Sequence, residues 1–282
     1  MSSLYAWVGI TRQAHQQQVA KQARRLELES WVVGEAEKLR KQHPRMGIRK
    51  LYEKIQPVGM GRDRFESLLV AQGFLLPRKR NYHRTTYSCY PWQAYDNHIK
   101  GLQLTDVNQL WVSDITYIRC GEVYQYMFLI LDVYSRKVVG WHVSDRLKAE
   151  GNIKALKMAL RGYNKGDLTG LIHHSDRGSQ YIYKGYTSLL GSHGITISMG
   201  NKAWENAHAE RINGILKNEY VLEREFSTLK ELRQVTRRAV KLYNEERPHW
   251  NLPGRRSPEN FEKFLRGVPP EGRSSYQVEI KY

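Results

Sequence analysis

Apolar residues recur at helical spacing in the first 75 residues of the chain, where Pro44 interrupts the pattern. Two shorter amphipathic stretches follow, from Gly47 to Tyr52 and from Arg62 to Gln72, and a glycine-bearing turn at residues 57–61 joins them. The pattern predicts an all-helical region at residues 1–75 that contains a helix-turn-helix unit. An ordinary helical hairpin would show the same pattern.

The pattern changes to runs of β-forming residues from Leu110 onwards. Three strands come first, with Gly121 and Glu122 as a candidate hairpin turn, and helices then alternate with two further strands. The predicted elements are strands 110–118, 124–134 and 137–143, helix 149–163, strand 171–175, helix 180–192, strand 195–199 and a helix from near Asn206. This order predicts an α/β fold with an RNase H-like mixed sheet flanked by helices, because hairpins join antiparallel strands and helical crossovers join parallel ones.

The segments around this core complete the predicted organisation. Residues 76–105 contain basic residues and prolines without periodicity, which is typical of a linker. A late helix is predicted to open at Thr228, with Glu231 three residues further on as in a capping box. The predicted domains are a helical DNA-binding region at 1–75, a basic linker at 76–105, a core at 106–222, a C-terminal helical extension at 223–265 and a tail at 266–282.

Composition and charge narrow the class of protein. The 282 residues include 45 Lys and Arg against 28 Asp and Glu, which gives a net charge of +17. The first 100 residues carry 18 of the basic residues and only 8 acidic ones. Such an excess favours a polyanionic partner, with nucleic acid as the first candidate, although a basic helical surface can also serve solubility alone. Two cysteines exclude a disulfide scaffold, and no apolar run approaches the roughly 20 residues that span a bilayer.

Three carboxylates are candidates for a metal site. Asp114 and Asp176 lie in or at the end of predicted strands, where aspartate is rare because its charge is costly to desolvate. Carboxylate oxygens are the ligands that Mg²⁺ prefers, so a bound cation would explain both positions. Glu210 and Lys217 lie about two helical turns apart on one polar stripe. That stripe alone is typical of a surface helix; together with the two aspartates it indicates phosphodiester chemistry.

Neighbouring titratable residues have weaker claims. Asp132, inside an apolar run, is either a hydrogen-bonding group at a strand end or a residue behind the metal ligands. His173 and His174 are candidates for metal or phosphate contacts, but alternation in a short strand turns at least one of them away from the site.

Five ordered motifs then identify a family. The segments are HPRMGIR at 43–49, WVSDITY at 111–117, HSDRGSQY at 174–181, NAHAE at 206–210 followed by LKNE at 216–219, and YNEERPH at 243–249 followed by Leu252 and Pro258. Over nearly its whole length the chain resembles the OrfB-type transposases of the third insertion-sequence family, which are relatives of retroviral integrases. Three departures from the family pattern stand close to the glutamate. The interval between Asp176 and Glu210 is two residues shorter than usual, Glu205 replaces a common aspartate, and Arg211 replaces a usual small polar residue.

The resemblance implies an Asp-Asp-Glu (DDE) transposase with a retroviral-integrase-like core. Asp114, Asp176 and Glu210 would be both catalytic residues and metal ligands for two Mg²⁺ ions, for which Mn²⁺ would substitute. The implied reaction is cleavage of DNA 3′ ends and strand transfer at insertion-sequence ends. The implied partners are transposon-end and target DNA, further copies of the chain on paired ends, and an upstream OrfA-type protein fused by frameshift. The expected location is the bacterial cytoplasm, in association with the nucleoid, without a membrane span.

Candidate DNA contacts come from four places. Arg62 and Arg64 stand at the start of the predicted recognition helix, and Lys217 is expected near the phosphate at the transposon end. The remaining candidates are Lys202 and Trp204 in the loop before the glutamate helix, and Arg237 and Arg238 on the late helix. For Trp204 a packing role is an equal alternative, and a structural turn is the favoured reading of the 247–249 segment.

Two other functions stay open at this point. A non-catalytic DNA-binding protein with a decayed site would use only the helix-turn-helix, and the intact carboxylates argue against it. An RNase H-like nuclease would cut without joining, and the C-terminal signature argues against that.

Overall fold

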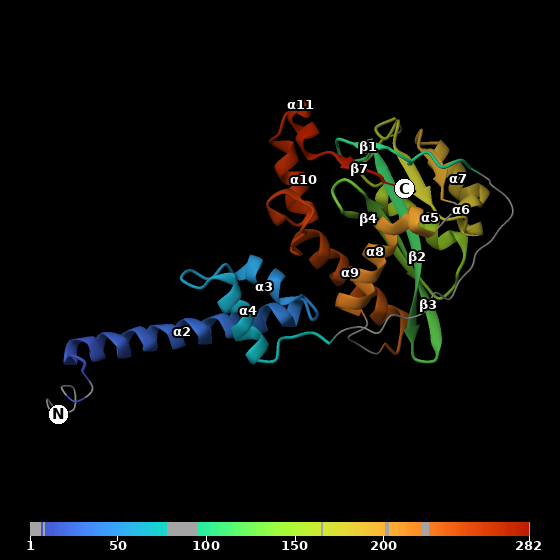
Figure 1. Cartoon of the computed structure of the whole chain (residues 1–282). Helices are drawn as coiled ribbons and strands as arrows, with labels where there is room; N and C mark the ends of the chain where they lie inside the picture. The colour runs from blue at the N-terminus through green and yellow to red at the C-terminus, as the bar shows by residue number, and fades with distance from the viewer. Residues whose placement is uncertain are drawn as a thin grey trace. The chain divides into compact units, whose positions relative to one another are not determined.

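The computed structural model describes residues 7, 9–77, 95–164, 166–200, 203–221 and 226–281. Contacts within the chain divide it into two compact units, residues 1–79 and residues 80–282 (Figure 1). Most of the predicted basic linker, at residues 78–94, lies outside the described residues.

The described part of the first unit is helical. Its elements are α2 (Arg12–Gln42), α3 (Ile48–Ile55) and α4 (Arg62–Ala71). The Thr11 hydroxyl accepts a 3.0 Å hydrogen bond from the Ala14 N–H and so starts α2. Between α3 and α4, Gln56 and Gly59 take left-handed conformations, with φ of 44° and 83°. The small core of the unit consists of Val32, Ala36, Met46, Leu51, Met60, Phe65 and Leu69.

The order helix, glycine-bearing turn, helix therefore appears where the sequence predicts it. No helix among the described residues is long and apolar enough to cross a membrane.

The second unit is built on a five-stranded mixed sheet in the order β4-β3-β2-β5-β6. The strands are β2 (Leu110–Cys120), β3 (Val123–Asp132), β4 (Val138–Ser144), β5 (Ile172–Ser175) and β6 (Thr196–Met199). The pairs β2–β3 and β3–β4 are antiparallel, whereas β2–β5 and β5–β6 are parallel. The hairpin turns at Gly121 and Glu122, since Cys120 pairs with Val123. This topology confirms the predicted RNase H-like α/β fold.

Helices cover both faces of the sheet (Figure 1). One face packs on α5 (Ala149–Ala159), α6 (Ser179–Ile182) and α7 (Lys184–Gly191) through Trp111, Phe128 and Ile130. The other face packs on α8 (Ala207–Leu216) and α9 (Leu229–Glu245) through Leu110, Val112 and Ile118. The backbone of α5 comes so close to Gly140 that an added Cβ would lie 2.3 Å from the Ala155 carbonyl oxygen. Glycine at this position therefore sets the distance between helix and sheet.

Short elements frame the glutamate helix α8. The 3₁₀-helix η1 (Ala203–Asn206) precedes it, and the π-helical turn η2 (Lys217–Val221) continues it. The predicted capping box of α9 is present: the Thr228 hydroxyl accepts from the Glu231 N–H at 3.2 Å.

The C-terminal segment folds back onto the sheet unit. It contains η3 (Pro253–Arg255), α10 (Pro258–Arg266), α11 (Pro270–Arg273), η4 (Ser274–Tyr276) and β7 (Val278–Glu279). Strand β7 pairs antiparallel with β1 (Gln103–Leu104), and Ile280 is fully buried beside it. Strand β7 therefore lies beside β1, which comes about 180 positions earlier in the chain (Figure 1).

Candidate active site

Asp114 is held in the middle of β2 by a contact from the glutamate helix. Its Oδ2 accepts a 2.7 Å hydrogen bond from the Asn213 side-chain amide of α8. Burial raises the pKa of Asp114 to about 7, and the negative charges of Asp176 and Glu210 add to the effect while the Asn213 bond opposes it. Asp176 and Glu210 therefore both lie within electrostatic reach of Asp114.

Asp176 follows β5 directly, at the carboxyl end of a strand parallel to β2. Its Oδ1 accepts a 3.0 Å hydrogen bond from the Gly178 N–H, which fixes the carboxylate. Burial raises the pKa of Asp176, and the bond from Gly178 opposes the shift. A Cβ at position 178 would lie 3.1 Å from this same oxygen and 2.9 Å from Gln180 Oε1, so glycine allows the chain to turn tightly around the aspartate.

Glu210 stands on the exposed side of the first turn of α8. The start of that helix is tied to the sheet by Asn206, whose side-chain amide donates to the Ser113 carbonyl at 2.9 Å. Ser113 is the residue before Asp114, so Asn206 and Asn213 connect the glutamate helix to the aspartate strand at two points.

The donor set suits a divalent cation in its chemistry. A carboxylate whose pKa is raised by burial and by neighbouring negative charges is stabilised in its ionised form when a cation binds beside it. Within the described part of the chain, no three His, Cys, Asp or Glu side chains stand close enough together to hold one ion.

Lys217 begins the π-helical turn that follows α8. Partial burial lowers its pKa. The backbone stays α-helical from Glu210 to Lys217, so the two residues lie about two turns apart, and the departure from the α-helical repeat comes after Lys217. Single π-turns of this kind are frequent at functional sites.

A buried ion pair braces this turn. Arg247 donates from Nε and Nη2 to the two carboxylate oxygens of Glu219, both at 2.7 Å. The Arg247 side chain is only 5% exposed and also lies over the ring of Tyr243. The Tyr243 hydroxyl donates to the Arg136 carbonyl, and Asn244 exchanges two hydrogen bonds with Val138 on β4. The C-terminal signature therefore acts as a structural brace between η2, α9 and the sheet.

Three titratable groups that the sequence left open have structural partners. Asp132 accepts from the Asn108 and Ser135 N–H groups, both at 2.7 Å, and from the Ser135 hydroxyl. His173 and His174 are buried and bonded to the hydroxyls of Tyr186 and Ser198, each at 2.9 Å. Burial lowers their pKa values to about 3 and about 4, which keeps both imidazoles neutral at neutral pH.

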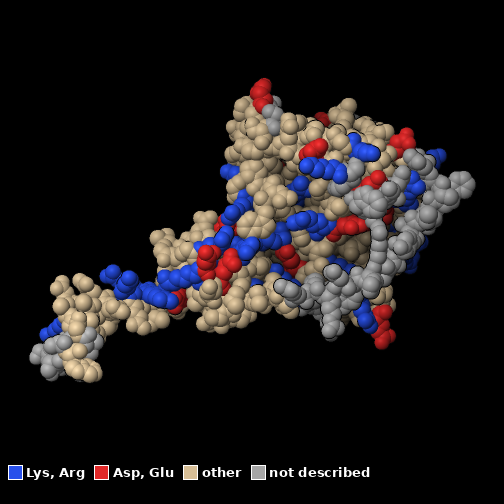
Figure 2. Space-filling model, viewed as in Figure 1, with Lys and Arg blue, Asp and Glu red and all other residues tan. Residues whose placement is uncertain are grey.

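The candidate DNA-contacting residues differ in whether they form ion pairs with acidic residues of the chain. Arg64 donates to Glu29 at 2.9 Å, and this bond lowers the pKa of Glu29. Arg62 pairs with Asp63 at 3.3 Å and is mostly exposed. Arg237 and Arg238 are exposed on α9. Lys202 and the Trp204 side chain lie outside the described residues. Lys and Arg side chains are spread over the face in Figure 2, with Asp and Glu among them.

Asn206 and Asn213 carry positioning contacts that the sequence did not reveal. Asn213 lies on the polar stripe of α8, but an asparagine on a helix does not by itself indicate a partner on a distant strand. Tyr117 was also missed. It is 40% exposed, and burial, then Tyr126 and the charges of Asp176 and Asp114, raise its pKa.

Comparison with known proteins identifies the family. Two models described as integrase core domain match residues 105–203 and 193–258. The insertion element IS600 31 kDa protein of Shigella sonnei is 35% identical over 225 residues, which cover 77% of this chain and 82% of that protein. The transposase InsF for insertion sequence IS3A of Escherichia coli K12 is 31% identical over 195 residues, which cover 68% of this chain and 67% of that one.

A solved structure with a similar fold is the HTLV-2 integrase catalytic core domain in complex with magnesium. It is 18% identical, with a TM-score of 0.43 over 58% of this chain and 98% of that chain. On its sequence relatives and its sheet topology, the chain belongs to the IS3-type insertion-sequence transposases, which are DDE polynucleotidyl transferases.

Proposed function

We propose that the chain cleaves the 3′ ends of an insertion sequence and joins them to target DNA in a Mg²⁺-dependent reaction, with Asp114, Asp176 and Glu210 as the catalytic carboxylates. The observation that supports the proposal is that the charges of Asp176, at the end of β5, and Glu210, on α8, both act to raise the pKa of Asp114 on β2. Carboxylates that are costly to ionise together favour a cation between them.

The same three residues would hold two Mg²⁺ ions, and Mn²⁺ would substitute. Bound there, the ions would activate a water or a DNA 3′-hydroxyl and neutralise charge on the leaving oxygen. Asn213 orients the Asp114 carboxylate, and the Gly178 N–H orients that of Asp176. Asn206 holds the start of α8 against β2, so that Glu210 remains beside the pair.

Lys217, at the far end of the same helix, would bind a phosphate of the transposon end. Its partial burial favours a fixed position over free motion in solvent. The Glu219–Arg247 pair, two residues further along η2, supports that position.

Further DNA contacts are proposed for residues other than the three carboxylates and Lys217. Arg62 would meet DNA from the start of α4, with Arg64 divided between DNA and Glu29. Arg237 and Arg238 on α9, and Lys202 and Trp204 in the loop before α8, would hold DNA near the core. Oligomerisation on paired ends, fusion to an upstream OrfA-type protein and action at the bacterial nucleoid complete the proposal.

Labelled element-end DNA tests this function. Wild type should cleave the 3′ end and transfer it to target DNA with Mg²⁺ and should be inactive in EDTA. Asp176→Asn should lose both steps, whereas Asp145→Asn, an exposed aspartate on the same unit, should retain them. Cleavage that survives Asp176→Asn would overturn the site assignment. Binding without cleavage would indicate a DNA-binding protein, and cleavage without joining would indicate a nuclease.

A further inference from the structure

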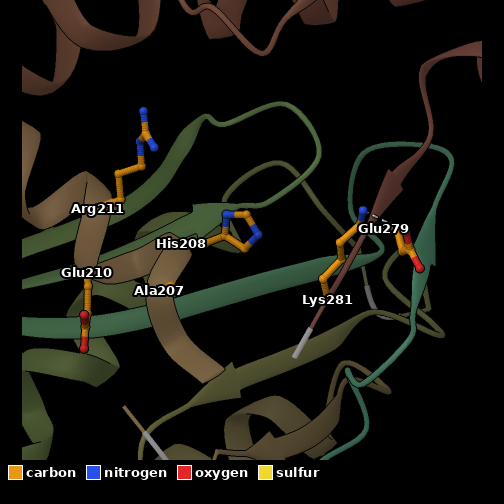
Figure 3. A pocket seen from close by; sticks show the side chains of 6 residues that line it. All are labelled: Ala207, His208, Glu210, Arg211, Glu279 and Lys281. Atoms are coloured by element: carbon orange, nitrogen blue, oxygen red, sulfur yellow. Dashed lines mark ion pairs between the residues drawn. The ribbon is translucent and has the colours of Figure 1, made fainter. Parts of the chain in front are cut away.

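An open pocket lies beside Glu210, on the side of α8 that faces the C-terminal segment (Figure 3). Its volume is about 640 Å³. The lining residues are Ala207, His208, Glu210, Arg211, Glu279 and Lys281. The proposed function assigns no role to this pocket, apart from the catalytic role of Glu210 at its edge.

Two segments far apart in the sequence build the pocket. The first turns of α8 supply one wall, and the residues around β7 supply the other. The second wall is held firmly, because Val278 and Glu279 pair with β1 and Ile280 is fully buried. Lys281 is therefore presented from an anchored strand end rather than from a loose terminus.

A third segment brings Arg136 to the same place. Its backbone has φ of 62°, a conformation that is uncommon for residues other than glycine, and the Tyr243 hydroxyl donates to its carbonyl at 2.9 Å. Nη1 of Arg136 contacts Nδ1 of His208 at 2.5 Å. Arg136 therefore contacts the ring of His208, which lines the pocket.

The basic groups are spread along the pocket rather than gathered at one point. Arg211 and Lys281 lie on opposite sides of His208 (Figure 3). Lys281 is 78% exposed at its side chain and lies 3.6 Å from Glu279. No ion pair of Arg211 occurs among the described residues, and its side chain is exposed. Spaced cations suit successive phosphates of a strand better than a single anion.

We propose that this pocket binds the backbone of the DNA strand held by the active site, with Arg211 and Lys281 donating to its phosphates. This inference rests on the proposed function, because it places the strand beside Glu210. The contact of Arg136 with His208 orients the ring between the two proposed phosphate contacts. The arrangement gives a role to Arg211, the residue that departs from the family pattern.

Salt dependence of DNA binding by the full chain in EDTA tests the pocket without any catalytic step. The probe is a fluorescently labelled DNA duplex with a single-stranded overhang, and the readout is the slope of log affinity against log salt. Arg211→Ser and Lys281→Ser should each lower the magnitude of this slope by about 0.9 for one lost phosphate contact. Arg211→Lys should restore most of it, since the charge is retained.

Matched controls are Arg161→Ser and Lys157→Ser, which remove exposed charges next to and within α5 on the opposite face of the sheet. The proposal predicts wild-type slopes for both. Equal losses in the controls would overturn it, because the effect would then come from net charge alone. Wild-type slopes for Arg211→Ser and Lys281→Ser would overturn it as well. Since EDTA removes the metal, these outcomes are independent of whether the carboxylates cleave DNA.

Discussion

The side-chain amide of Asn213 donates a 2.7 Å hydrogen bond to Oδ2 of Asp114, from the glutamate helix to the strand that carries the first aspartate. Asn213 would therefore act on the metal site through Asp114, the proposed ligand that its side chain contacts. The Asn213 Oδ1 is buried without a hydrogen-bond partner, so the amide is oriented by this one contact.

Asn213→Ala should slow cleavage by about 10–100-fold, which is the usual cost of losing a hydrogen bond behind a metal ligand. The rate should recover in part as the Mg²⁺ concentration is raised, because the carboxylate remains present but less well oriented. DNA binding in EDTA should not change. A cleavage rate and a Mg²⁺ dependence equal to those of wild type would show that Asn213 only packs. Gln234→Ala, at an exposed position of α9, is the control.

Asp114→Asn should stabilise the metal-free fold at pH 8. The folded-state pKa of Asp114 is raised from 3.8 to about 7. The folded state therefore favours the neutral carboxyl group. Its contribution to the free energy of unfolding is fully present below pH 3.8 and is lost as the pH rises through 7. At about 1.4 kcal/mol per pH unit, ionised Asp114 costs a few kcal/mol. The gain in the free energy of unfolding should therefore shrink as the pH is lowered towards 5.

Urea unfolding in EDTA at both pH values measures this difference, with Asp145→Asn as the exposed control. Added Mg²⁺ should stabilise wild type and leave Asp114→Asn nearly unchanged. A variant less stable than wild type at pH 8 would contradict the assignment of the charge cost to Asp114.

Removing the guanidinium of Arg247 should strongly destabilise the second unit. Arg247→Met leaves the carboxylate of Glu219 without its bidentate partner, and breaking a buried pair in this way costs about 3–5 kcal/mol. The double variant Arg247→Met with Glu219→Gln should recover part of that loss. Lys241→Met breaks a largely exposed pair with Glu245 and should cost at most about 1 kcal/mol. Equal losses for the two single variants, measured by denaturant unfolding, would refute the brace.

Gly178→Ala should impair cleavage far more than it impairs folding. The new methyl group would crowd both Asp176 Oδ1 and Gln180 Oε1, so the aspartate would have to turn away from its position. Gly191→Ala is the matched control, since a Cβ there meets nothing within 4 Å. Cleavage rates and melting temperatures of both variants check the expectation, which fails if the two variants cleave equally well.

The strands of the sheet, their order along the chain and the hairpin at Gly121 could be predicted because strand patterns and turn residues are local signals. The capping box at Thr228 was predictable for the same reason. The π-turn at Lys217 was not, because the α-helical pattern simply continues through it. The β1–β7 pair was missed because two-residue strands carry no alternation, and their pairing joins positions about 180 residues apart.

The features of the candidate site also differ in whether the sequence reveals them. Asp114 and Asp176 stand out as charges in a strand context, which a sequence displays. The bond from Asn213 and the approach of Lys281 to α8 depend on how helix, strand and C-terminal segment pack, which no local pattern encodes.

The assignment of Glu210 as the third catalytic carboxylate is tested most directly by comparing it with Glu205. The two glutamates lie five positions apart, on η1 and on the first turn of α8, and the charge of Glu205 acts on His174. The rate of Mg²⁺-dependent 3′-end cleavage should be measured for Glu210→Gln and Glu205→Gln under identical conditions. We expect Glu210→Gln to abolish cleavage while it binds DNA in EDTA as wild type does, and we expect Glu205→Gln still to cleave. Cleavage by Glu210→Gln at the wild-type rate would contradict the assignment.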